Sequence, residues 1–206
     1  MTPPRIRHVL FDFDGVLAHY DHELRIGHLA RHCSAAHERV REVLFTSGLE
    51  TEYDGGAIST DAYLARLGEG LAHGIDVEAW LGSRLAGSRA DEATLAQILA
   101  LDPALALGVL TNNGRLMAQA IPRIVAPLYP RLEGRVLCSG ALCVRKPDPR
   151  VFRLALDQLG WNAGETLFVD DVFANVQGAR SIGLHADTVN DARSLRRVLK
   201  RFGLAA

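Results

Sequence analysis

One short segment constrains the fold of this chain more than any other. Residues 8–17 read His-Val-Leu-Phe-Asp-Phe-Asp-Gly-Val-Leu, so an apolar run leads directly into two carboxylates. Such a run is typical of a strand buried on both faces. Side chains alternate along an extended strand, so Asp12 and Asp14 should point to the same side and Phe13 away from them. Gly15 follows and can adopt a backbone conformation that a Cβ disfavours.

Two acids beside a buried strand are costly unless a cation or a shared proton compensates them. This cost indicates that Asp12 and Asp14 serve a function. The alternative is an exposed Asp-x-Asp-Gly turn, which is a common feature of surface loops.

Composition limits the possible classes of protein. The 206 residues suffice for one domain, or one domain with a subdomain, and 48% hydrophobic with 23% charged residues is typical of a globular chain. A formal net charge of -1 provides no general attraction to nucleic acid or anionic lipid. No apolar run approaches the roughly 18 residues that span a bilayer. We therefore expect neither nucleic acid nor a membrane as a partner.

The N-terminus and the cysteines favour a cytoplasmic location. No signal-peptide pattern precedes the acidic segment. Cys33, Cys138 and Cys143 are odd in number and lack the spacing of a zinc site. We expect them to be packed as small apolar side chains.

Residues 18–87 are predicted to be helical, without a strand. Apolar residues at amphipathic spacing fill residues 21–49, Asp-Gly-Gly interrupts the pattern at 54–56, and Ser59 or Thr60 can cap the next helix. Another helix is predicted at 77–85. This block is interpreted as an inserted helical cap over the acidic strand end, joined through a flexible Gly87-Ser88. The predicted domains are an α/β core, residues 1–17 and 88–206, and a cap subdomain, residues 18–87.

Strands and helices alternate in the remainder of the chain. Strands are predicted at residues 105–110, 135–138, 166–169 and 184–189, with helices between them and a basic helix at the C-terminus. This alternation indicates right-handed βαβ units. The predicted fold class is α/β, a Rossmann-like doubly wound parallel sheet with an inserted helical cap.

Polar side chains follow three of the predicted strands at the points where those strands end. They are Asp12 and Asp14, Thr111 and Asn112, and Asp170 and Asp171. The carboxyl ends of parallel strands share one edge of the sheet, and ligands bind there. Lys146, in a loop before a helix, can reach the same edge.

Four segments resemble the ordered motifs of the haloacid dehalogenase-like hydrolase superfamily. They are Phe-Asp-Phe-Asp-Gly-Val-Leu at 11–17, Leu-Thr-Asn-Asn at 110–113, Arg-Lys-Pro-Asp-Pro at 145–149 and Phe-Val-Asp-Asp at 168–171. The match covers nearly the whole chain. Residues 144–149 and 169–179 are similar to the branch with a small helical cap after the first motif. That branch includes sugar-phosphate phosphatases and the phosphatase domain of soluble epoxide hydrolase. The resemblance implies a central first strand, between the strands that end in Thr111 and Asp170.

The resemblance also implies a Mg²⁺-dependent phosphatase that acts on a small phosphorylated metabolite, such as a sugar phosphate. Mg²⁺ would be held by the Asp12 side chain, the Asp14 carbonyl and Asp170, with Asp171 bound through water or positioning the site. A hard divalent cation suits such oxygen ligands and offsets the charge of the acids and the phosphate.

The implied reaction proceeds through an aspartyl-phosphate. Asp12 would attack phosphorus, and Asp14 would protonate the leaving oxygen and later activate water. Thr111 and Asn112 would hold phosphoryl oxygens, and Lys146 would compensate negative charge.

Each of these residues also has a structural alternative. Thr111 and Asn112 could cap the following helix, Lys146 could be a solvated loop lysine, and Asp170-Asp171 could be an acid pair favoured by a helix dipole.

Other features remain open. Asn175 could lie near the acidic pair or on the surface, and the turn at residues 52–56 could contact substrate. His28 and His32, one helical turn apart, could bind a metal but are more often solvated. The basic C-terminal helix could bind a membrane, but is more often docked on its own domain.

Several functions share these motifs. The family's dehalogenases also use the first Asp but lack an acid at the position of Asp14, which counts against that activity here. A phosphomutase retains both acids, and a non-catalytic binding module usually lacks them. The oligomeric state, monomer or homodimer, is open.

Overall fold

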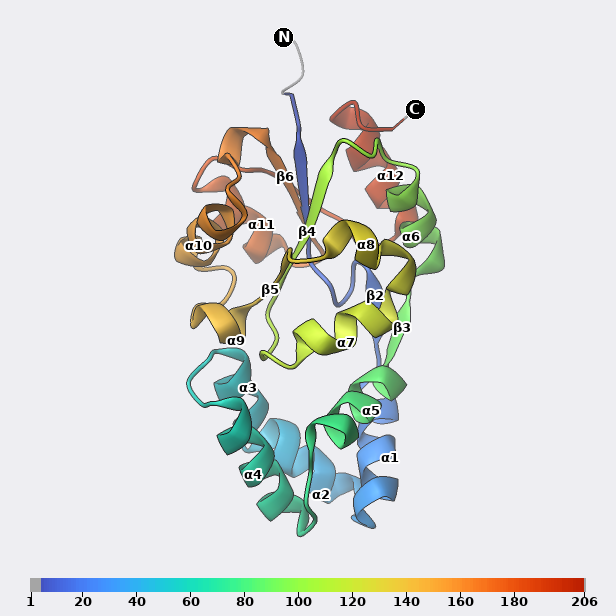
Figure 1. The fold of residues 1–206 in the computed structure, drawn as a ribbon, viewed down its shortest axis with the longest axis vertical. Coiled ribbons are helices and arrows are strands. Elements are labelled where there is room, and N and C mark those ends of the chain that lie inside the picture. Colours follow the sequence, from blue (N-terminus) through green and yellow to red (C-terminus); the bar gives the residue numbers. More distant parts are fainter. Residues whose placement is uncertain (1–4, 206) are drawn as a thin grey trace.

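The computed structural model describes residues 5–205 and places a five-stranded parallel sheet at the centre of the chain (Figure 1). The sheet order is β5-β4-β1-β6-β7, and each neighbouring pair is parallel. The strands are β1 His8–Phe11, β4 Ala106–Thr111, β5 Val136–Cys138, β6 Thr166–Asp170 and β7 His185–Thr188. The predicted parallel strands are therefore confirmed, with the first strand between those that end in Thr111 and Asp170.

Helices cover both faces of the sheet because the strands are apolar on both faces. Val9 and Phe11 belong to one buried cluster and Leu10 to another. On the Leu10 face lie α10 (Pro149–Leu159) and α11 (Phe173–Arg180). On the other lie α6 (Glu92–Leu99), α7 (Met117–Ile124), α8 (Tyr129–Leu132) and α12 (Ala192–Arg201). The predicted doubly wound fold is confirmed. Short turns complete the domain: η2 Ala126–Leu128, α9 Ser139–Leu142 and η3 Ala163–Glu165.

A group of helices, residues 22–87, lies beyond the carboxyl ends of the strands, and we call it the helical lobe (Figure 1). It contains α1 His22–Cys33, α2 His37–Arg41, the π-helix η1 Glu42–Thr46, α3 Leu49–Asp54, α4 Thr60–Leu71 and α5 Val77–Gly87. Asp21, Ser59 and Asp76 cap α1, α4 and α5 through their side chains.

The prediction that residues 18–87 contain no strand is wrong. β2 (Ala18–Tyr20) pairs antiparallel with β3 (Ser88–Ala90), so the two connections to the lobe form a ribbon. Strands of three residues are too short to show an alternating pattern. The predicted flexible joint at Gly87-Ser88 is also wrong, because Gly87 belongs to α5 and Ser88 to β3. Gly87 ends α5, and a Cβ there would lie 2.9 Å from the Asp21 carbonyl oxygen, so this glycine permits close packing against α1.

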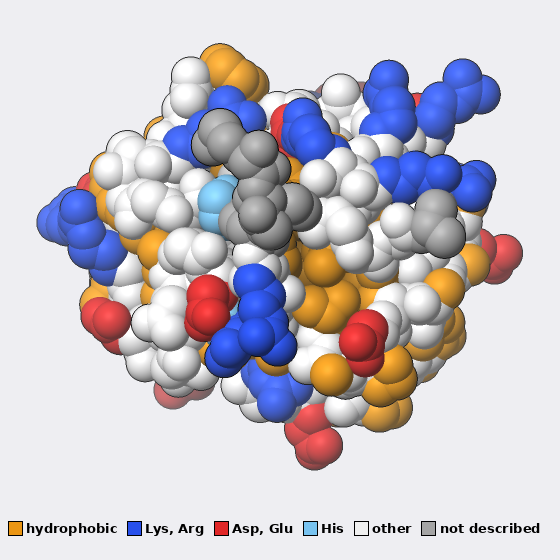
Figure 2. All heavy atoms as spheres, turned by 90° about the horizontal axis from the view of Figure 1, so that it is seen from above, with side chains coloured by type: hydrophobic (Ala, Val, Ile, Leu, Met, Phe, Trp, Pro, Cys, Tyr) orange, Lys and Arg blue, Asp and Glu red, His pale blue; other side chains and the backbone are white. Residues whose placement is uncertain are grey.

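The basic C-terminal helix docks on its own domain, which was the more common alternative to binding a membrane. Leu195, Val198 and Leu199 of α12 are buried in the core. Figure 2 looks onto the end of the molecule that carries the termini, where Lys and Arg side chains stand at several separate places among uncharged and acidic ones. Across residues 5–205, no helix is both long enough and apolar enough to cross a membrane.

Candidate active site

The sheet order brings Asp12 and Asp170 together, because Asp170 ends β6 and Asp12 directly follows the neighbouring strand β1. The Lys146 ammonium lies between them, with Nζ 2.8 Å from Asp12 Oδ1 and 2.7 Å from Asp170 Oδ2. The exposed fractions are 7% for Asp12, 0% for Asp170 and 4% for Lys146. Lys146 is therefore a buried partner of the acids, and the solvated-lysine alternative is wrong.

Negative charge exceeds positive charge in this cluster. Burial raises the pKa of Asp12, and the charge of Asp170 adds to the rise while Lys146 opposes it. Burial also raises the pKa of Asp171, again with a contribution from Asp170. Burial alone would lower the pKa of Lys146, but Asp12 and Asp170 outweigh it and raise the pKa above its usual value. Three carboxyl groups thus lie near one ammonium, which pairs directly with two of them, Asp12 and Asp170.

A divalent cation fits this arrangement. One oxygen from each of Asp12, Asp170 and Asp171 lies within 4.8 Å of the others, and no second group of this kind occurs within residues 5–205. Gly15 has φ +84°, and a Cβ at that position would overlap the Asp171 carboxylate. Carboxylate oxygens are the donors that Mg²⁺ prefers. The Asp14 side chain is not part of this group.

Asn175 orients one of these acids. Its Nδ2 donates to both oxygens of Asp170 at 3.0 Å, and the Val172 backbone N–H donates to Oδ1 at 2.8 Å. Asn175 is 6% exposed, so the surface alternative is wrong. Hydrogen bonds of this kind fix the direction in which a metal-binding carboxylate points.

Thr111 and Asn112 follow β4 at the same edge of the sheet. Thr111 is buried, and its Oγ1 accepts a hydrogen bond from Asn113 Nδ2 at 2.7 Å. Asn112 pairs with the Lys146 backbone, donating to its carbonyl and accepting from its N–H, both at 2.9 Å. The Asn112 side chain therefore positions the lysine loop, and a phosphate contact by this residue stays a prediction. The helix-cap alternative is wrong, because Leu116 is the N-cap of α7.

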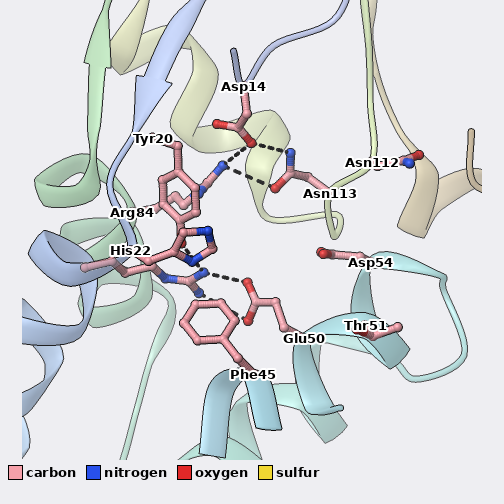
Figure 3. Close-up of a pocket in the computed structure, with 11 residues that line it drawn as sticks. Asp14, Tyr20, His22, Phe45, Glu50, Thr51, Asp54, Arg84, Asn112 and Asn113 are labelled. Atoms are coloured by element: carbon pink, nitrogen blue, oxygen red, sulfur yellow. Dashed lines mark hydrogen bonds and ion pairs between the residues drawn. The ribbon is translucent and has the colours of Figure 1, made fainter. Parts of the chain in front are cut away.

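Asp14 contacts an arginine from the helical lobe (Figure 3). Its Oδ2 accepts from Arg84 Nη2 at 2.6 Å and from Asn113 Nδ2 at 3.0 Å. Sequence reasoning missed Arg84, which is 2% exposed and lies 70 positions from its partner. Nothing in the local pattern of α5 indicates that partner.

A pocket of about 290 Å³ lies between the sheet edge and the helical lobe (Figure 3). The core lines it with Asp14, Asn112 and Asn113, and the rest of its lining is Tyr20, His22, Arg25, Phe45, Glu50, Thr51, Asp54 and Arg84. The acid cluster and this pocket thus lie at one edge of the sheet.

Two acids on α3 face this pocket, one helical turn apart. Glu50 forms an ion pair with the buried Arg25, with Oε1 2.6 Å from Nη1. Burial raises the pKa of Asp54 to about 7, and Glu50 adds to this rise while Arg145 opposes it. Within the turn at residues 52–56, Asp54 lines the pocket, whereas Glu52 pairs with Arg66 on the surface.

The helical lobe touches the core beside this pocket. Ser139 Oγ donates to the Asp54 carbonyl at 2.5 Å, and the Leu116 N–H donates to the Tyr53 hydroxyl at 3.0 Å. The Tyr53 ring packs directly on Gly114, where a Cβ would overlap it. These contacts hold α3 against α9 and the loop that follows β4.

His28 and His32 of α1 do not join a metal-binding group within the described part of the chain. His32 is exposed and its ring meets that of His73 edge-on, with centroids 5.2 Å apart. His28 lies against α5 at Gly82.

Comparison with known proteins agrees with this geometry. Residues 6–183 match the family model described as haloacid dehalogenase-like hydrolase. The chain belongs to this family. It is 30% identical over 194 residues to a phosphoglycolate phosphatase of Rhodospirillum rubrum, a match that covers 85% of this chain and 76% of that one.

Two further proteins resemble the chain. Phosphatase MT3486 of Mycobacterium tuberculosis is 35% identical over 92 residues, which are 45% of this chain. The chain spans only 42% of the length of that relative. A Bacteroides thetaiotaomicron enzyme of the family, solved in complex with magnesium and inorganic phosphate, has the same fold, with a TM-score of 0.73 and 19% identity. That match covers 89% of this chain and 93% of the other.

Proposed function

We propose that this protein is a Mg²⁺-dependent phosphatase that hydrolyses a small phosphorylated metabolite through an aspartyl-phosphate. The observation that carries the proposal is the buried Asp12–Lys146–Asp170 arrangement at the edge of the sheet. An acid held beside an ammonium and a group of metal-binding carboxylates is suited to attack an anionic phosphate ester.

The free oxygen of Asp12 is the proposed nucleophile. Oδ1 accepts from the Phe13 N–H at 2.6 Å and pairs with Lys146, which leaves Oδ2 for phosphorus. As the Oδ2–P bond forms, the bond from phosphorus to the ester oxygen breaks, and Asp14 donates a proton to that oxygen. Asp14 then removes a proton from water as the water attacks phosphorus and regenerates Asp12.

Charge on the phosphoryl group is compensated from several sides. Lys146 lies beside the nucleophile, and Thr111, Asn112 and nearby backbone N–H groups are proposed to hold the phosphoryl oxygens. Mg²⁺ held by Asp12, Asp170, the Asp14 carbonyl and, directly or through water, Asp171 would neutralise charge on the phosphate.

We further propose that residues 18–87 act as a cap that limits the site to small substrates. The pocket of about 290 Å³ suits a leaving group of few atoms, and its lining is rich in hydrogen-bonding side chains. A sugar phosphate fits both features. The proposed active form is a monomer or a homodimer.

Dehalogenation and phosphoryl transfer within a mutase are the alternatives. Asp14 disfavours dehalogenation, because displacement of a halide needs no proton donor. A mutase would retain the phosphoryl group, so release of inorganic phosphate in water distinguishes it from a phosphatase.

The test is phosphate release from a panel of small phosphate esters, with Mg²⁺ or with excess chelator. We expect release only with Mg²⁺, and none from Asp12→Asn, whose amide has nearly the same shape but cannot form the intermediate. Full activity in chelator, or substantial activity of Asp12→Asn, would contradict the proposal.

A further inference from the structure

The helical lobe presents two acids to the pocket, and only one of them is fully engaged by the protein. Arg25 donates to both oxygens of Glu50, at 2.6 and 3.3 Å, and the Tyr63 hydroxyl donates to Oε2 at 2.6 Å. Asp54 lies one helical turn further along α3 and forms no ion pair within residues 5–205. The Asp54 carboxyl group is therefore the acid that remains available to a ligand.

The Asp54 side chain points into the pocket. In Figure 3 its carboxyl group is directed toward the space between Asn113 and Glu50. The rings of His22 and Phe45 stand on the opposite side of this space, with their centroids 4.8 Å apart. A carbon chain can pack on these rings while one of its hydroxyl groups reaches Asp54.

The cations that line the pocket already have anionic partners. Arg25 pairs with Glu50 at 2.6 Å. Arg84 pairs with Asp14, also at 2.6 Å. Burial lowers the pKa of His22, and both arginines lower it further, so its imidazole is uncharged above pH 7. An anionic leaving group would therefore meet a free carboxylate and no unpaired cation among these side chains.

Arg145 lies near Asp54 but does not line the pocket. Its charge opposes the rise in the pKa of Asp54, which burial brings to about 7. At pH 8 the Asp54 carboxyl group is therefore mainly ionised and only accepts hydrogen bonds. A hydroxyl group can donate such a bond, whereas a second carboxylate cannot donate and is repelled.

From this arrangement we propose that Asp54 is a specificity-determining residue, which selects phosphate esters of a neutral polyol over esters whose leaving group carries a carboxylate. The inference rests on the proposed phosphatase activity. Asp54 accepts a hydrogen bond from a hydroxyl group of the leaving group and takes no part in the transfer of phosphorus or of protons. The three arginines around the pocket balance its three acids, so net charge does not attract a cationic leaving group.

The test compares phosphate esters that differ at a single carbon. 3-Phosphoglycerate has a carboxylate where glycerol 3-phosphate has a hydroxymethyl group, and 6-phosphogluconate differs from sorbitol 6-phosphate in the same way. At pH 8 with Mg²⁺, we expect the wild-type kcat/KM to be at least about tenfold higher for the polyol ester of each pair.

Two substitutions at position 54 separate charge from hydrogen bonding. Asp54→Asn keeps an acceptor but removes the charge, so kcat/KM should rise about tenfold for 3-phosphoglycerate and change less than about threefold for glycerol 3-phosphate. Asp54→Leu removes the acceptor as well and should lower kcat/KM for glycerol 3-phosphate by about tenfold. The matched control is Glu52→Gln on the same helix. Glu52 pairs with Arg66 on the surface and does not line the pocket, so the ratio within each pair should stay at the wild-type value.

Three outcomes would overturn the inference while leaving the phosphatase proposal intact. The first is a wild-type protein that does not prefer the polyol ester of each pair. The second is an equal change for both members of a pair in Asp54→Asn, as a purely structural role would give. The third is a higher wild-type kcat/KM for ethanolamine phosphate than for 2-hydroxyethyl phosphate, which would assign the pocket to a cation. A wild-type protein that releases phosphate from none of the esters would instead overturn the proposed function, and this inference with it.

Discussion

Replacement of Lys146 by methionine should destabilise the fold strongly. Methionine has a similar length but no charge, so Asp12 and Asp170 would lose an ammonium that lies 2.8 and 2.7 Å away. Removal of one partner from a buried ion pair costs about 3–5 kcal/mol. In a domain of this size about 1 kcal/mol shifts the melting temperature by about 2–4 °C. We therefore expect a fall of about 6–20 °C.

This loss should depend on pH. The pKa of Asp12 is already raised by burial, and removal of Lys146 would raise it further. An acid whose pKa is raised in the folded state costs stability as the pH rises from its unfolded pKa to its folded pKa. The folded pKa of Asp12 is about 8 in the wild type and higher in the variant, so the extra loss of Lys146→Met builds up above pH 8 and its deficit should be smaller at pH 7 than at pH 9.

Scanning calorimetry at both pH values provides the measurement. The chain contains only two lysines, and the other, Lys200, is exposed on α12. Lys200→Met is therefore a matched control, with an expected change within about 0.5 kcal/mol. If Lys146→Met melted at the wild-type temperature at pH 9, Lys146 could not be the cation that compensates the buried acids.

Two further substitutions test the electrostatics and the geometry of the site. Asp54→Asn should stabilise the protein above pH 7 but not near pH 4, because ionisation of Asp54 costs folding free energy only between its unfolded pKa of 3.8 and its folded pKa of about 7. This rise in pKa corresponds to at most about 4 kcal/mol. Denaturant unfolding at pH 4 and pH 9 measures the effect, and equal effects at both pH values would refute it. Gly15→Ala should lower the free energy of unfolding by about 1–3 kcal/mol, because alanine disfavours φ +84°. It should also weaken Mg²⁺ binding, because its Cβ would displace Asp171. Denaturant unfolding and a calorimetric Mg²⁺ titration test these effects, and unchanged Mg²⁺ affinity would contradict the proposed role of Asp171.

The sheet and the acids at its edge could be predicted because each depends on short-range patterns. A buried parallel strand is a continuous apolar run, as in Val9-Leu10-Phe11, and its end is marked by the first charged residue, Asp12. Once several such strands are placed in one parallel sheet, their ends must share an edge. Asp12 and Asp170 were therefore predictable neighbours.

Residues that act across the gap between lobe and core could not be predicted in this way. Arg84 reaches Asp14, and Asp54 reaches the loop after β4, only through the docking of two units. The side chain of Asn112 binds the backbone of Lys146, 34 positions away, which no local spacing indicates. Such contacts depend on how the helical lobe and the loops are placed, which periodicity does not specify.

The most direct test of the account is chemical capture of the intermediate on Asp12. An aspartyl-phosphate is an acyl phosphate, and borohydride reduces it to homoserine, which peptide mass spectrometry can locate. During turnover of a phosphate ester with Mg²⁺, we predict homoserine at position 12 and none after Asp12→Asn. Steady release of phosphate without any modification at position 12, or with capture at another residue, would contradict the proposal that Asp12 is the nucleophile.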